Sequence, residues 1–168
     1  WRQLGCSNYD FLSAVALNGA GGLFLGGTYA GQTTLGTIAL PAPRGRDLFI
    51  AHLTAEGSFD WAHGFGAGGS ESVATMVFDG GALTVSGIVE RSTDLGGGVL
   101  PTSFRSAFLA RYDAAGVHRW SQVFSRASGD YSGDPRIALA PGGDVVMTSW
   151  LIGGVTLGNN QPQAEKIG

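Results

Sequence analysis

Residues 64–69, Gly-Phe-Gly-Ala-Gly-Gly, contain the G-x-G-x-x-G pattern of dinucleotide-binding loops. That chemistry needs a helix directly after the loop, because the N-terminus of the helix binds the pyrophosphate. The residues that follow, 71–79, are short, apolar and typical of a strand. The equivalent segments elsewhere in the chain also lack the motif. We therefore interpret 64–69 as a glycine-rich turn and predict no cofactor site.

Candidate metal ligands are few in this sequence. Asp130 and Asp134 enclose small oxygen-bearing residues, and calcium takes six to eight oxygen ligands. This segment lacks the terminal Glu of the familiar calcium loops, and Asp and Ser also cap turns by bonding their own backbone. The three histidines, His52, His63 and His118, show neither H-x-H nor H-E-x-x-H spacing. We predict no metal site, with calcium at 130–134 as the minor alternative, and expect His52 to occupy an outward polar position.

Nucleophilic catalysis has no sequence signature here. There is no G-x-S-x-G elbow and no S-x-x-K motif, since Lys166 is the single lysine. Two carboxylates from different parts of the chain could still meet and hydrolyse a glycosidic bond. The sequence offers four glutamates for such a pair: Glu56, Glu71, Glu90 and Glu165. We predict that the protein is not an enzyme, and keep a carbohydrate-cleaving activity as an alternative.

Charge and composition exclude several other partners. The net charge is −3, so no basic footprint for nucleic acid is present. Arg44 and Arg46 flank a glycine and could bind an anion, but a solvated loop is the simpler interpretation. No apolar run reaches the roughly 18 residues of a membrane span. Cys6 is the single cysteine, which predicts a small buried apolar residue and no internal disulfide.

The elements that must position any site come from an internal repeat of about 60 residues. Trp1, Trp61 and Trp120 recur at intervals of 60 and 59 residues, and we expect them to pack the repeats together rather than to bind sugars. The repeats are 1–60, 61–119 and 120–168, the last of which is incomplete. The other repeated positions are the glycines that close Thr-Leu-Gly or Asp-Leu-Gly, at Gly36, Gly96 and Gly158, and the pair Phe49 and Phe108.

Each repeat is predicted to form four strands joined by glycine-rich turns. The first strands are expected at 13–18, 71–79 and 136–140, the second at 23–29, 83–90 and 145–152, and the third at 48–54 and 107–113. The fourth strand begins at the repeated Trp. Segment 48–53 is apolar almost throughout, which indicates burial on both faces. Four-stranded sheets stacked radially bury both faces, so the predicted fold is an all-β propeller of antiparallel blades, in one domain over 1–168.

These motifs, with Asp-Leu-Phe-Ile-Ala-x-Leu-x-x-x-Gly at 47–57, resemble the bacterial surface β-propeller repeats known as seven-bladed propeller (SBBP) repeats. The first repeat matches best; the second has Ser106 in place of Asp47, and the third stops before this segment. The resemblance implies a propeller of an exported or cell-surface protein and brings no catalytic residues with it. It extends over essentially the whole chain.

The length predicts an incomplete ring. Propellers close with four to eight blades, whereas 168 residues supply about 2.8 repeats. We expect further blades of the same chain, or other copies, to complete the ring. The function predicted is a binding or scaffold segment with a protein or glycan partner, and the alternative is a carbohydrate-binding or carbohydrate-cleaving propeller. Trp1 follows no signal-peptide pattern, so we expect any export signal to lie outside this chain, and the site of action to be extracellular, cell-surface or periplasmic.

Overall fold

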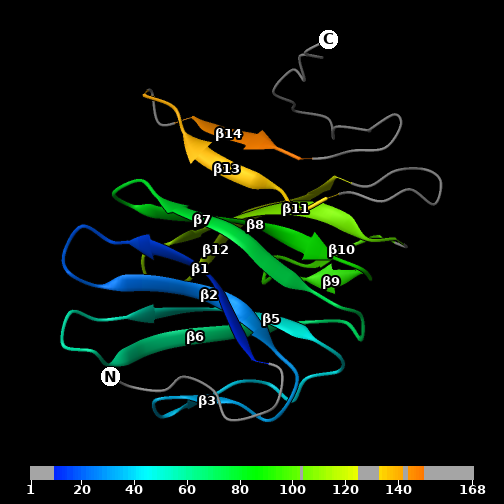
Figure 1. Ribbon diagram of the computed structural model, residues 1–168, viewed down its shortest axis with the longest axis horizontal. Helices are drawn as coiled ribbons and strands as arrows, with labels where there is room; N and C mark the ends of the chain where they lie inside the picture. Colours follow the sequence, from blue (N-terminus) through cyan, green and yellow to red (C-terminus); the bar gives the residue numbers. More distant parts are fainter. Residues whose placement is uncertain (1–9, 103, 125–132, 142–143, 150–168) are drawn as a thin grey trace.

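The computed structural model describes residues 10–102, 104–124, 133–141 and 144–149, and every regular element in them is a β-strand (Figure 1). The expectation of an all-β chain with antiparallel sheets is confirmed. The strands are β1 (Phe11–Leu17), β2 (Leu23–Tyr29), β3 (Thr34–Leu35), β4 (Ile38–Ala39), β5 (Asp47–Leu53), β6 (Phe59–Phe65), β7 (Ser72–Phe78), β8 (Ala82–Val89), β9 (Thr93–Asp94), β10 (Val99–Leu100), β11 (Ser106–Asp113), β12 (His118–Phe124), β13 (Arg136–Leu139) and β14 (Val145–Thr148). No helix in these residues is long and apolar enough to cross a membrane.

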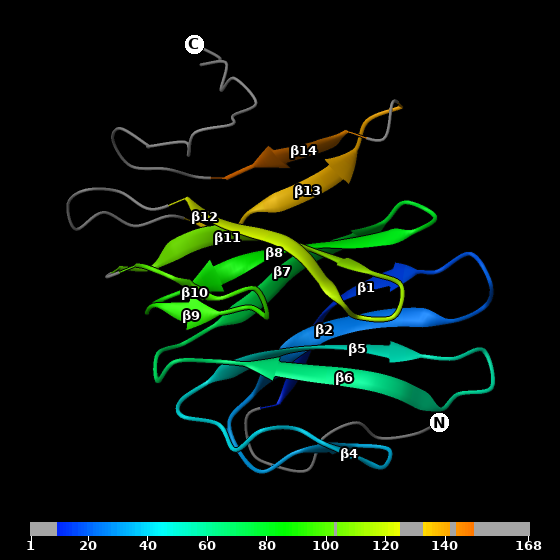
Figure 2. The same ribbon diagram turned by 180° about the vertical axis from the view of Figure 1, so that it is seen from behind.

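The long strands form two four-stranded antiparallel sheets with the orders β1-β2-β5-β6 and β7-β8-β11-β12. In each sheet a short hairpin, β3–β4 or β9–β10, interrupts the connection between the second and third strands. The β13–β14 hairpin lies beyond the second sheet, so the chain builds three layers in sequence order (Figures 1 and 2). The first strands of successive layers are neighbours, because β7 packs against β1 on one side and β13 on the other.

The two four-stranded sheets repeat each other in register. The first two strands shift register at a bulge, at Ser13 in one sheet and Ala74 in the other. Opposite each bulge is a glycine: a Cβ on Gly27 would lie 2.0 Å from the backbone oxygen of Phe11, and one on Gly87 would lie 1.9 Å from the corresponding carbonyl oxygen. Only glycine fits so close an approach of two backbones. The bulges therefore occur at equivalent places because the same glycine occurs there.

The third and fourth strands repeat as well. His52 pairs with Trp61 in the first sheet, and Arg111 pairs with Trp120 in the second. In both sheets the pairing register shifts directly after this residue. The Trp is the third residue of β6 and of β12, so these strands begin two residues earlier than the sequence indicated. A strand is not required to begin at its largest side chain, and Phe59 and His118 continue the pairing beyond the Trp.

The apolar core lies between the layers. Phe24, Leu48 and Ile50 of the first sheet pack against Val73 and Met76 of the second. Further clusters cover the opposite face of each sheet, which explains why the central strands are apolar on both faces. The predicted strands thus have the burial that their composition indicated.

The Thr-Leu-Gly and Asp-Leu-Gly motifs form the short hairpins rather than open loops. Leu35 and Leu95 are buried and join the neighbouring clusters. Gly36 and Gly96, which follow them, have φ angles of +62° and +102°, a region that favours glycine. The motif therefore combines an apolar side chain for the core with the residue that the turn needs.

Candidate functional site

The junction between the two sheets brings together two loops from different parts of the chain. The chain leaves β6 and reaches β7 through residues 66–71, and this loop runs beside residues 44–47, which lead into β5. Arg46 donates its backbone N–H to the Gly69 carbonyl at 3.1 Å, and Glu71 donates its own to the Arg46 carbonyl at 2.8 Å. Two backbone hydrogen bonds therefore hold the loops at fixed positions relative to one another.

Each loop carries a buried carboxyl group at this junction. Glu71 is fully buried, and neither of its carboxylate oxygens accepts a hydrogen bond of ordinary geometry. Asp47 is also buried; its Oδ2 accepts the backbone N–H of Arg44 at 3.3 Å, and its Oδ1 has no partner. Three buried carboxylate oxygens at one junction thus accept no hydrogen bond of ordinary geometry. This is unusual, because buried polar atoms in proteins are nearly always hydrogen-bonded.

Burial raises the pKa of both groups. The pKa of Glu71 rises to about 7, first because of burial and second because of the charge of Asp47, while the nearby amides of Ala67 and Glu90 act in the opposite direction. Burial also raises the pKa of Asp47, and the amides of Arg44 and Gly45 partly offset this effect. The junction thus disfavours two free negative charges.

The glycines of the G-x-G-x-x-G segment leave the space that these carboxyl groups occupy. A Cβ on Gly66 would lie 2.1 Å from Cγ of Asp47, and one on Gly69 would lie 2.8 Å from Oε1 of Glu71. A strand, β7, follows the loop, so no helix N-terminus is available to bind a pyrophosphate. The glycine-rich turn expected from the sequence is present, and it packs around Asp47 and Glu71, which no local sequence signal indicated.

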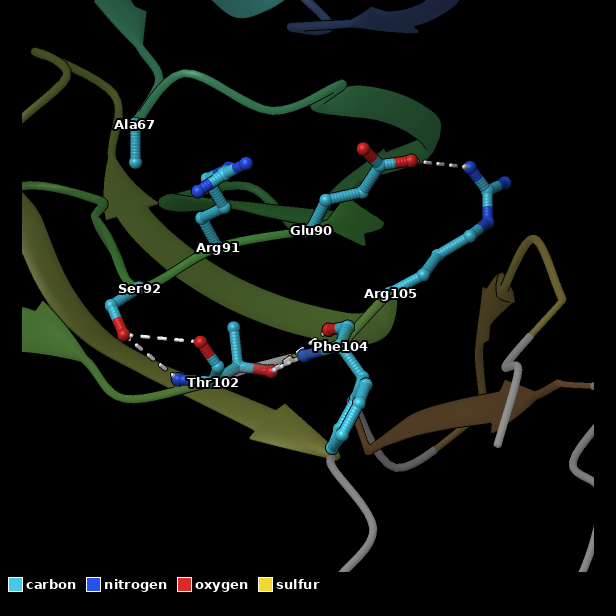
Figure 3. A pocket seen from close by; sticks show the side chains of 7 residues that line it. All are labelled: Ala67, Glu90, Arg91, Ser92, Thr102, Phe104 and Arg105. Atoms are coloured by element: carbon cyan, nitrogen blue, oxygen red, sulfur yellow. Dashed lines mark hydrogen bonds and ion pairs between the residues drawn. The ribbon is translucent and has the colours of Figure 1, made fainter. Parts of the chain in front are cut away.

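Figure 3 shows a surface pocket of about 780 Å³. It is lined by Ala67, Glu90, Arg91, Ser92, Thr102, Phe104 and Arg105. Arg105 forms ion pairs with Glu90 at 3.7 Å and with Asp134 at 3.1 Å, and Arg91 extends into the space between Ala67 and Glu90 (Figure 3). Ala67 and Glu90, whose amides lower the pKa of Glu71, both line this pocket.

The repeated positions serve the packing of the sheets. Trp61 donates its Nε1–H to the Ala114 carbonyl at 3.1 Å and stacks on His63 with ring centroids 5.3 Å apart, so it packs against the second sheet. Trp120, at the equivalent position, is 41% exposed. Phe49 and Phe108 are buried in the core. The described residues do not include Trp1 or Gly158.

The histidines and the remaining candidates are not assembled into a site. His52 is largely buried rather than outward, and its ring nitrogens hydrogen-bond to the side chains of Asn18 at 3.0 Å and Asp60 at 2.8 Å. No three His, Cys, Asp or Glu side chains in the described part of the chain are grouped to hold a metal ion. Asp134 pairs with Arg105, and its expected calcium partner Asp130 lies outside the described residues. So do Cys6, Glu165 and Lys166.

Comparison with known proteins gives no family assignment. No model of a known protein family matches the chain, and no curated protein matches it at a significant level. The resemblance to SBBP repeats therefore stays a prediction from the motifs. The geometry itself limits what Glu71 can do: a fully buried carboxyl group cannot touch a substrate at the surface, but it can bind a small ion or a proton.

Proposed function

We propose that this chain is a non-catalytic scaffold and binding segment of a β-propeller, belonging to an exported or surface-associated bacterial protein. Its nearest partners are further four-stranded units of the same kind, from the same chain or from other copies. The observation that carries the proposal is a row of exposed apolar side chains on β1, whose equivalents on β7 are buried or partly buried.

The row consists of Leu12, Val15 and Leu17, which are 52%, 56% and 72% exposed. The shared bulge register places Leu12 at the position of Val73, and Val15 at the position of Met76. Both of those β7 residues are buried, because the first sheet covers them. Burying an apolar side chain of this size contributes about 1.5–3 kcal/mol, so a similar cover over β1 is strongly favoured.

The other end of the stack supports the same arrangement. Trp61 is covered by the turn that joins β11 to β12 in the next sheet, through its hydrogen bond to Ala114. Trp120 has the same place in the second sheet, but the β13–β14 hairpin does not bury it. The cover that Trp120 needs is the turn between the third and fourth strands of the next unit.

The stacking order favours a propeller over a two-sheet sandwich. In a propeller the first strands of successive blades lie next to one another around the axis. The same neighbourhood is present between β1, β7 and β13, and the Ser13 hydroxyl donates to the Val73 carbonyl at 2.7 Å to join two of these strands. A sandwich, in contrast, has only two layers, each with one face toward solvent.

Self-association of the purified 168-residue protein tests this proposal. Light scattering is expected to show association that Val15→Glu combined with Leu17→Glu removes, because the two charges lie in the uncovered row. Val99→Glu serves as the control, since Val99 is exposed on the β9–β10 hairpin and not on β1. A monomeric protein that binds no hydrophobic dye, and behaves like the double variant, would contradict the proposal. The mass of the native chain then shows whether further blades belong to the same polypeptide.

Carbohydrate binding is the second candidate, favoured by the pocket of Figure 3. Phe104 is 43% exposed and lines the pocket together with Ser92 and Thr102, a combination of an apolar side chain and polar residues that suits a sugar. A glycan array tests it. Reproducible binding that Phe104→Ala abolishes, and that Phe11→Ala leaves intact, would favour a lectin-like role; no binding to any glycan would remove it.

A further inference from the structure

Asp47 and Glu71 form the most unusual arrangement of charge in the described part of the chain. Neither takes part in an ion pair within 4 Å among these residues, whereas Glu90, Asp79, Asp113 and Asp134 each pair with an arginine. Arg44 is near enough to lower the pKa of Asp47 but forms no such pair with it. The two carboxyl groups are buried together without a protein cation between them.

The contacts place both groups against one short loop. Asp47 packs on Gly66 and Glu71 packs on Gly69, and the two loops are joined by hydrogen bonds at Arg46. Three of the four carboxylate oxygens accept no hydrogen bond of ordinary distance and angle, although the amides of Ala67 and Glu90 are near enough to Glu71 to lower its pKa. Buried charge is costly unless an opposite charge or a set of donors compensates for it. A bound proton or cation would compensate the negative charge of these two carboxyl groups.

The donor chemistry selects the kind of cation. The unpartnered atoms are all oxygens, which suits hard cations rather than zinc with its nitrogen and sulfur ligands. Two carboxylates neutralise a divalent charge. Calcium accepts irregular sets of carboxylates, main-chain carbonyls and water, whereas magnesium requires near-ideal octahedral geometry. Glu90 is near enough to raise the pKa of Glu71 but pairs with Arg105, so carbonyls and water must supply the other ligands, and the flexible coordination of calcium suits such a set better.

We propose that Asp47 and Glu71 together bind one calcium ion at the junction between the first and second sheets, with main-chain carbonyls of loops 44–47 and 66–71 and water completing its ligands. The ion would join the segment leading into β5 to the segment leading into β7. It would thereby fix the position of one sheet relative to the next. Neither Asp47 nor Glu71 lines the pocket of Figure 3, and this proposal does not depend on the proposed ring.

The second sheet provides an internal comparison. Ser106 occupies the position of Asp47, and its hydroxyl already bonds to the Thr102 hydroxyl and the Phe104 carbonyl, both at 2.9 Å. The Ser106 side chain is neutral and already hydrogen-bonded, so it needs no cation. The expected stoichiometry is therefore one calcium ion per chain rather than one per repeat.

Calorimetric titration of the chelator-treated protein with calcium chloride tests the proposal. We expect one ion per chain and a higher unfolding temperature in calcium than in chelator, with a weaker response to magnesium. Glu71→Gln and Asp47→Asn should each weaken calcium binding at least tenfold, because each removes one charged ligand. Glu56→Gln is the matched control, since Glu56 lies in the exposed turn before β6 and should bind calcium like the unmodified protein.

Two results would overturn the proposal. One is an unmodified protein that takes up no calcium, and whose unfolding temperature does not change at millimolar calcium; a proton on Glu71 would then be the compensating charge. The other is unchanged binding in both carboxyl variants. If the variants do not fold, terbium luminescence of the unmodified protein decides. Emission that calcium displaces with one-site stoichiometry supports the site, and no such emission rules it out.

Discussion

Replacing Trp61 and Trp120 by alanine, one at a time, compares two equivalent positions, of which only the first is covered by the next sheet. Trp61 packs near Phe24, stacks on His63 and donates a hydrogen bond across the sheet junction to Ala114. Trp120 has the same place in its own sheet but is 41% exposed. The two substitutions remove the same atoms, so the difference between them measures the cover together with the ring contacts of Trp61 to Phe24 and His63.

The magnitudes follow from burial and hydrogen bonding. A well-buried Trp→Ala change costs about 3–5 kcal/mol, and Trp61 is half-buried, so we expect a loss of about 3 kcal/mol. About 1 kcal/mol of this belongs to the Nε1–H bond. Trp120 is more exposed to water, so we expect Trp120→Ala to lower the free energy of unfolding by about 1 kcal/mol. The expected difference between the two variants is about 2 kcal/mol.

Urea unfolding followed by far-ultraviolet circular dichroism measures both losses, and it does not depend on the fluorescence that the substitutions remove. Trp61→Phe is the control, because it keeps an aromatic ring but cannot donate the hydrogen bond; its loss should fall between those of the unmodified protein and Trp61→Ala. Equal losses for Trp61→Ala and Trp120→Ala, or a larger loss for Trp120→Ala, would refute the argument that the next sheet covers the first Trp.

Three further predictions concern the fold. Gly87→Ala should lower the free energy of unfolding by at least about 2 kcal/mol, because the new Cβ would lie 1.9 Å from a backbone carbonyl oxygen. Gly81→Ala is the control: its Cβ would enter open space, so it should change the free energy of unfolding by less than about 0.5 kcal/mol. Thermal unfolding measures both variants. Leu95→Ala should cost about 2–4 kcal/mol by urea titration, whereas Val99→Ala should cost almost nothing, since Leu95 is buried and Val99 is exposed; similar losses would contradict the packing of the β9–β10 hairpin. Burial raises the pKa of the Tyr112 hydroxyl, which donates to the Leu95 carbonyl at 2.8 Å, so this residue should lower stability as pH rises above about 10, where the unfolded chain loses the proton and the folded chain keeps it. Urea titrations below and above that pH should show a smaller decrease for Tyr112→Phe, and an unchanged decrease would be evidence against the burial of this hydroxyl.

The strands could be predicted because their signals are local. Apolar segments such as 48–53, and the glycine pairs at the turns, are properties of a few consecutive residues. The β3–β4 and β9–β10 hairpins could not be predicted in this way, since strands of two residues are too short to show a periodicity. Their one visible signal was the repeated Leu before Gly36 and Gly96, which in retrospect marks a core residue next to a turn.

The sequence misplaced His52 for a related reason. Its alignment with Arg111 indicated an outward polar position, and both residues do have polar partners. The neighbours of His52, however, are the rings of Phe24 and Trp61, at centroid distances of 4.7 and 6.2 Å. A residue at a given register position is as buried as the side chains of the adjacent strands make it, and these neighbours cannot be read from a single segment.

The junction carboxyl groups were hidden for a different reason: Asp47 and Glu71 belong to different repeats and meet only because two loops pair. Asp47 lies where the copies differ, since it becomes Ser106 in the second sheet while Phe49 is kept as Phe108. Shared positions such as Phe49 and Phe108 are buried, and shared glycines such as Gly27 and Gly87 are required by the close approach of two backbones. Such positions maintain the fold, so they are equal in every unit. A chemical function that occurs once in the chain must use residues that are not repeated, and the departures from the repeat are therefore the first places to test for binding.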